Sequence, residues 1–79
     1  MSNLPSLSYV KFIKKIKKAG FIFKRQAAGS HEIWFNPSTK RTVTVPHHSG
    51  KTFKKGTLAS MIKDTGLSRE EFINLKSII

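Results

Sequence analysis

Three short segments rich in β-branched and aromatic residues follow one another in the middle of the chain, at 21–25, 31–35 and 41–45. The sequence QAAGS joins the first two, and NPSTK, with its Asn-Pro turn signal, joins the second and third. Five residues are too few for the crossover that parallel strands require, whereas antiparallel neighbours need only a hairpin. The segments therefore predict a three-stranded antiparallel sheet.

A helical pattern precedes this sheet. Between residues 7 and 19, apolar side chains recur at spacings of three and four, and lysines occupy the rest of the cylinder. Ser6 or Ser8 can cap the start of this helix, and Gly20 follows its end. The expected inward positions are Tyr9, Phe12, Ile13 and Ile16. Residues 1–5 have the composition of a loose leader.

Two further helices are predicted after the sheet. A basic loop, HHSGKTFKKG, leads into a helix at 57–65 that Gly66 stops. Ser68 to Glu71 reads as a capping box that opens a short last helix. The expected inward positions of these helices are Leu58, Met61, Ile62, Phe72 and Leu75.

The resulting order is α-β-β-β-α with a short C-terminal helix, which predicts an α+β fold with helices on one face of the sheet. We expect one domain over residues 1–79, and the same order occurs in the double-stranded-RNA-binding domain. In the second strand we expect Ile33 and Phe35 to face the core. Trp34 then lies on the opposite surface and His31 at the rim of the helix side, unless a one-residue bulge reverses the orientation.

Charge indicates the class of partner. The chain has 15 Lys and Arg against 4 acidic residues, a formal net charge of +11, and such a surface favours polyanions. Nucleic acid is the first expectation, with an acidic protein or an anionic membrane surface as alternatives. No apolar run approaches the roughly 20 residues of a membrane span, and the N-terminal residues lack a secretory pattern. With no cysteine, a cytoplasmic protein that binds no membrane is expected.

The few acidic residues argue against metal chemistry. Two-metal nucleases need clustered carboxylates, but Glu32 and Asp64 stand apart from the pair at 70–71. His47 and His48 are sequence neighbours whose side chains diverge, with no acid or cysteine nearby. No metal and no cofactor are therefore expected.

Gly-Ser-His at 29–31, TVTVPHHSGK at 42–51 and KKGTLASMIKDTGLSREEF at 54–72 together resemble the HicA toxin family. The likeness runs from the lysine-rich first helix to the closing GLSREEF. It implies a double-stranded-RNA-binding-like fold, metal-independent mRNA cleavage and inhibition by a HicB antitoxin. It also implies that His31 is the catalytic histidine and that His48 matches the second family histidine. Glu32 departs from the family pattern and can orient His31 or face solvent.

RNA carries its own nucleophile, the 2′-hydroxyl, so an enzyme needs a base and stabilisation of the charged phosphorane. A histidine titrates near neutral pH and can act as this base, and we assign the role to His31. Gly29 and Ser30 allow close approach of the backbone to phosphate and offer donors. The general acid is unassigned, with His48 and Lys51 as candidates. The alternative is that His31 is an ordinary residue at the start of a strand.

The loop before the second helix is the expected phosphate contact, because helix N-termini and lysines bind phosphate. The expected RNA-binding residues are Gly29, Ser30, His48, Lys51, Lys54, Lys55 and Lys63, with the four lysines in one region. A solvated charged loop is the alternative. The sequence thus predicts an endoribonuclease toxin. A non-catalytic RNA-binding module, a degenerate toxin and a DNA-binding regulator remain as alternatives.

Overall fold

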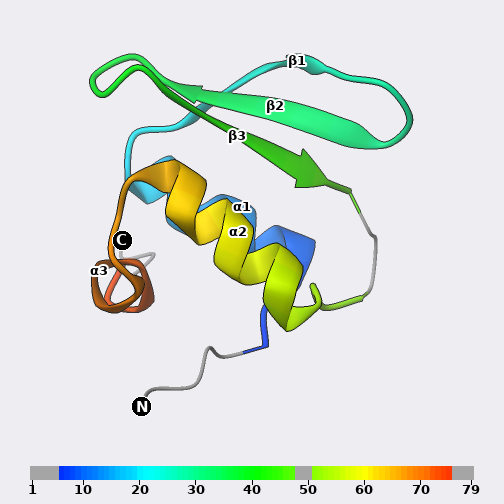
Figure 1. The fold of residues 1–79 in the computed structure, drawn as a ribbon. Coiled ribbons are helices and arrows are strands. Elements are labelled where there is room, and N and C mark those ends of the chain that lie inside the picture. The colour runs from blue at the N-terminus through cyan, green and yellow to red at the C-terminus, as the bar shows by residue number, and fades with distance from the viewer. Residues whose placement is uncertain (1–5, 48–50, 76–79) are drawn as a thin grey trace.

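The computed structural model describes residues 6–47 and 51–75, in which one helix precedes three strands and two helices follow (Figure 1). The elements are α1 (Tyr9–Lys18), β1 (Ile22–Gln26), β2 (His31–Asn36), β3 (Arg41–Pro46), α2 (Lys55–Thr65) and α3 (Arg69–Ile73). The predicted order is confirmed, and each boundary lies within two residues of its predicted place. The predicted leader at 1–5 lies outside the described residues.

The sheet has the order β1-β2-β3, and both pairs are antiparallel, as the two short connections predict. The register of β1 against β2 shifts between Phe23 and Arg25. Both α1 and α2 lie on the same side of the sheet, and no described helix covers its other side (Figure 1). We call the uncovered side the outer sheet face.

The core lies between the sheet and the helices. The predicted helix caps explain where the helices begin and end: Ser8 Oγ accepts a hydrogen bond from the Lys11 amide, and Ser68 and Glu71 form the capping box. Gly66 closes α2 in the left-handed conformation, which glycine adopts without strain. The largest fully buried side chains are Phe12, Ile16, Val43, Val45, Leu58 and Phe72.

The predicted orientation of β2 is wrong. Trp34 and Glu32 are buried on the helix side, at 5% and 8% exposure, while Ile33 and Phe35 are half-buried on the outer sheet face. The bulk of Trp34 gains most from burial, and its indole N–H donates to the Glu32 carboxylate, so both polar groups are satisfied. His31 has the same parity as Ile33 and Phe35, but it stands at the end of β2, where its side chain lies beside residues of α2.

Lys15 has a structural role within the lysine-rich α1. Its ammonium group donates to the carbonyl oxygens of Phe72, Ile73 and Leu75, at 3.5, 3.2 and 2.6 Å. The cation thus binds carbonyl groups at and just after the end of α3, where helical N–H donors run out. Burial lowers the pKa of Lys15. One lysine of the predicted basic face therefore holds the C-terminal helix in place.

Candidate functional site

His31 is the first residue of β2 and follows the turn that joins β1 to β2. The amide of Ala27 donates to the His31 carbonyl at 2.8 Å, and the side-chain amide of Gln26 donates to the same oxygen at 3.1 Å. Gly29 occupies the turn at a φ of +66°, a conformation that side chains rarely adopt. Two hydrogen bonds and a turn that needs glycine therefore hold the backbone of His31 in place.

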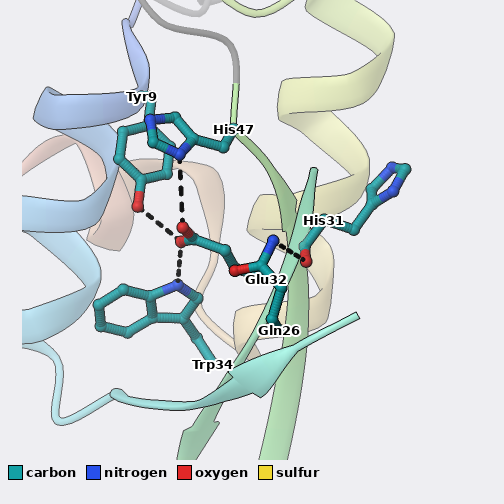
Figure 2. A network of polar contacts seen from close by, with 6 residues as sticks. All are labelled: Tyr9, Gln26, His31, Glu32, Trp34 and His47. Carbon is teal, nitrogen blue, oxygen red and sulfur yellow. Dashed lines mark hydrogen bonds and ion pairs between the residues drawn. The ribbon is translucent and has the colours of Figure 1, made fainter. Parts of the chain in front are cut away.

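The same turn orients the imidazole ring. The Nδ1 atom of His31 lies 3.2 Å from the carbonyl oxygen of Ala28. Because a carbonyl oxygen can only accept a hydrogen bond, this contact places the ring proton on Nδ1. In the neutral ring, Nε2 then carries the lone pair and can accept a proton. The side chain is exposed and points away from Tyr9, Trp34 and His47 (Figure 2).

His31 lines an open groove of about 460 Å³ where the end of the sheet meets α2. The residues of β3 in this groove are Thr44 and Pro46. The α2 side is formed by Gly56, Thr57, Ser60, Met61 and Asp64. The groove gives a polymeric substrate access to the imidazole from solvent, since it is a surface hollow and not an enclosed cavity.

A second hollow of about 380 Å³ adjoins this groove, and Pro46 and Thr57 line both. Its other lining residues are Lys51, Thr52, Phe53 and Lys54. Lys54 is also the N-cap residue of α2, and no side chain caps the first N–H groups of that helix. These N–H groups and the two ammonium groups make the hollow suited to a phosphate.

Of the predicted RNA-binding residues, the structure brings Lys51 and Lys54 into one hollow, which adjoins the groove of His31. Gly29 and Ser30 lie in the turn before His31, and Lys55 is the first residue of α2. Lys63 lies in the last turn of α2 and lines a different hollow with Leu67 and others. His48 lies outside the described residues. The expected single region of four lysines is therefore reduced to Lys51, Lys54 and Lys55.

Glu32 neither orients His31 nor faces solvent, so neither sequence-based alternative holds. Its Oε1 atom accepts hydrogen bonds from the Tyr9 hydroxyl at 2.6 Å and the Trp34 indole N–H at 3.0 Å (Figure 2). Its Oε2 atom lies 3.5 Å from Nδ1 of His47. We call Tyr9, Glu32, Trp34 and His47 the Glu32 network, in which Glu32 and Trp34 are buried. It lies on the opposite side of β2 from the imidazole of His31.

His47 joins this network to the turn before His31. Its ring stacks on Tyr9 with 4.0 Å between the centroids, and its amide donates to the Ser30 carbonyl at 2.9 Å. Burial and the neighbouring Glu32 carboxylate raise the pKa of Tyr9 to about 12. Sequence reasoning missed the network because its members come from α1, from β2 and from the residue after β3. The available signal was the shared parity of Glu32 and Trp34 on one strand.

Two further findings apply to residues 6–47 and 51–75. Histidine, cysteine, aspartate and glutamate side chains nowhere gather in groups of three or more that would suit a metal ion. No helix in these ranges combines the length and the apolar character that a bilayer crossing requires.

Comparison with known proteins identifies the family. None of the curated proteins compared with the chain matches it. The sequence profile described as "HicA toxin of bacterial toxin-antitoxin" matches residues 10–67, which is more than half of the chain. The matched segment contains the turn before His31, the groove and the whole of α2. The chain therefore belongs to the HicA family, the toxins of bacterial toxin–antitoxin systems.

Proposed function

We propose that this toxin is an endoribonuclease in which His31 is the general base. The main support is the contact between Nδ1 of His31 and the Ala28 carbonyl oxygen. This contact leaves Nε2 as the proton acceptor beside an open groove. A general base must present a lone pair within reach of substrate, and an exposed ring held by its own turn meets that requirement. Metal ions have no role in the proposed step.

The proposed reaction is an attack within the RNA strand. Nε2 of His31 takes the proton of a 2′-hydroxyl, and the 2′ oxygen forms a bond to the adjacent phosphorus. The bond from phosphorus to the 5′ oxygen breaks, and that oxygen takes up a proton as it leaves. Of the two candidates for the proton donor, His48 and Lys51, only Lys51 lies within the described residues, and it lines the adjoining hollow. The products are a 2′,3′-cyclic phosphate and a 5′-hydroxyl end.

The adjoining hollow supports this proposal electrostatically. Lys51 and Lys54 and the first N–H groups of α2 are placed to bind a phosphate of the strand next to the scissile bond. They also stabilise the negative charge that builds up on the phosphorane.

Membership of the family implies an antitoxin partner. We propose that this partner is an acidic, HicB-type protein that covers His31, because a strongly basic surface attracts an acidic one.

The test is RNA cleavage in EDTA by the parent protein and by His31→Ala, with RNA binding measured for both. His47→Gln is the matched control, because it removes a histidine from the opposite side of β2. We expect the parent and His47→Gln to cut, leaving cyclic phosphate ends, and His31→Ala to bind without cutting.

Cleavage that requires added metal and leaves a 5′-phosphate would contradict the mechanism. If all three proteins bind RNA and none cuts it, the chain is an RNA-binding module or a degenerate toxin. If His31→Ala cuts as fast as the parent, the base is another group.

A further inference from the structure

The outer sheet face is not covered by any described helix (Figure 1). Thr44, which pairs with Ile33, also lines the groove that holds His31. Antiparallel register fixes which side chains share this face, because directly paired residues point to the same side. Phe35 pairs with Ile22 and Thr42, and Ile33 pairs with Arg25 and Thr44. All of them share the side of His31, which has the same parity as Ile33 and Phe35 on β2.

Phe35 presents an aromatic ring with a cation above it. The ammonium group of Lys24 lies 5.0 Å from the centroid of the Phe35 ring. Lys24 stands where the register shifts between Phe23 and Arg25, and it has no paired residue on β2. Its side chain is exposed and crosses to the ring of the neighbouring strand. An aromatic ring and a positive charge thus lie together on this surface.

The charge of the face favours a polyanion. Lys24 and Arg25 lie on it, and no acidic residue stands at an outward position of the three strands, all of which are described. A protein partner would need a continuous apolar area, but Ile33 and Phe35 are half-buried and have cations beside them. A nucleotide needs one aromatic surface for its base and one cation for its phosphate, and this face offers both.

Position along β2 supports the same reading. Phe35 is four residues from His31 on the same side of the strand, a separation of about 13 Å at the usual rise per residue. This distance suits a short stretch of single-stranded RNA. An endonuclease must hold its substrate on both sides of the bond it cuts. The hollow at Lys51 and Lys54 lies on one side of His31, and the outer sheet face extends on the other.

We propose that Phe35 and Lys24 form a binding subsite for a nucleotide of single-stranded RNA, a few positions from the bond cut at His31. The base stacks on the Phe35 ring, and the Lys24 ammonium group moves from the ring to a neighbouring phosphate. Arg25 neutralises the next phosphate. This inference rests on the proposed endoribonuclease function and adds a second contact surface to it. Duplex RNA cannot use the subsite, because its bases are already stacked and paired.

The test measures binding of a fluorescently labelled 2′-O-methyl RNA 12-mer, as a single strand and as a duplex. This probe lacks the 2′-hydroxyl nucleophile, so binding is measured without cleavage. Phe35→Leu keeps the apolar character but removes the aromatic face. Phe23→Leu is the matched control, because Phe23 is 49% exposed on the same hairpin but packs edge-on against Trp34 on the helix side. Thermal unfolding midpoints establish that both variants are folded.

We expect Phe35→Leu to weaken single-strand binding by about five- to tenfold and to leave duplex binding within twofold. Phe23→Leu should change neither. Lys24→Gln, which leaves the sheet core intact, should reduce the slope of log affinity against log salt by about one unit or slightly less. Equal effects of Phe35→Leu and Phe23→Leu, or equal losses for single strand and duplex, would overturn the subsite.

Cleavage assays on the same variants separate the two proposals. If the parent cuts unmodified RNA and Phe35→Leu binds and cuts it equally well, the subsite is wrong and the proposed function stands. In that outcome the outer sheet face is left for a protein partner. If the parent binds the single strand through Phe35 but never cuts, the subsite stands and the catalytic proposal fails.

Discussion

The hydroxyl group of Tyr9 in α1 donates a 2.6 Å hydrogen bond to the carboxylate of Glu32 in β2, across 23 positions of sequence. The acceptor is almost fully buried, and Trp34 donates to the same oxygen. A buried carboxylate that loses a donor keeps its desolvation cost without the compensating bond. This bond therefore ties the first helix to the central strand.

We expect Tyr9→Phe to lower the free energy of unfolding by about 1–2 kcal/mol, since one charge-assisted hydrogen bond is lost and the ring is kept. Urea denaturation at neutral pH measures the change. His31→Ala is the control, because its exposed side chain contributes little to the core. A Tyr9→Phe protein as stable as the parent would show that water replaces the hydroxyl group.

The pH dependence of stability provides a second test of the same bond. The pKa of Tyr9 is about 12 in the folded chain, against 10.0 for the ordinary group. The protonated hydroxyl is therefore favoured by folding. Its contribution is complete below pH 10 and is lost as the pH rises through 12. The stability difference between the parent and Tyr9→Phe should therefore shrink between about pH 10 and about pH 12. Lysine titration acts on both proteins and cancels in the difference.

Gly29→Ala tests the turn that orients His31. A Cβ atom at this position meets only His31 Nδ1, at 3.9 Å, so the cost arises from the positive φ and not from a clash. We expect a loss of stability of about 1–2 kcal/mol and a fall in RNA cleavage that exceeds the fall in RNA binding. Gly56→Ala in α2 is the matched control and should raise stability by up to about 1 kcal/mol. Equal cleavage by Gly29→Ala and the parent would show that the turn is not needed.

Neutralising Lys54 and Lys55 with glutamine should weaken RNA binding and reduce the salt slope by about one to two units. The reason is that each lysine at the start of α2 displaces a counterion when it contacts phosphate. Lys63→Gln, at the other end of the same helix, should change the slope much less. Binding titrations at several salt concentrations measure the slopes. Equal slopes for the double variant and the parent would remove the phosphate role from this hollow.

Lys15→Met should destabilise the protein by about 1–2 kcal/mol, because the carbonyl oxygens of Ile73 and Leu75 lose the ammonium donor. Lys14→Met, the neighbouring exposed lysine of α1, should be nearly neutral. Urea denaturation compares the two variants, and hydrogen exchange in α3 locates the effect. Equal stability of both variants would make Lys15 a solubilising residue like its neighbour.

The fold was predictable where local chemistry decides it. The hairpin connections allow only antiparallel neighbours, and the capping box at Ser68 marks the start of α3 without reference to the rest of the chain. The position of Lys63 was also within reach. Eight residues of helix separate it from Lys55, which is about 12 Å along the axis.

The orientation of β2 was not predictable from the sequence of this strand alone. In HEIWF both alternations contain apolar residues, so either face can be chosen locally. The choice is made by distant partners, since Tyr9 satisfies Glu32 and the paired Val43 and Val45 lie on the same side as Trp34. The family motif therefore identifies His31 from the sequence. It does not indicate the surroundings of the side chain, because distant partners decide the orientation of β2.

His31 and Glu32 are adjacent in sequence and point to opposite sides of one strand. Under the proposed function, a genetic selection for survivors of toxin expression would recover changes at both positions for different reasons. Survivors altered at His31 should accumulate as full-length protein that no longer harms the host. Survivors altered at Glu32 should be depleted by cellular proteases, because a weakened fold is unfolded more often. Changes at two adjacent positions would thus inactivate the toxin by different routes, one through lost activity and the other through a lower amount of protein.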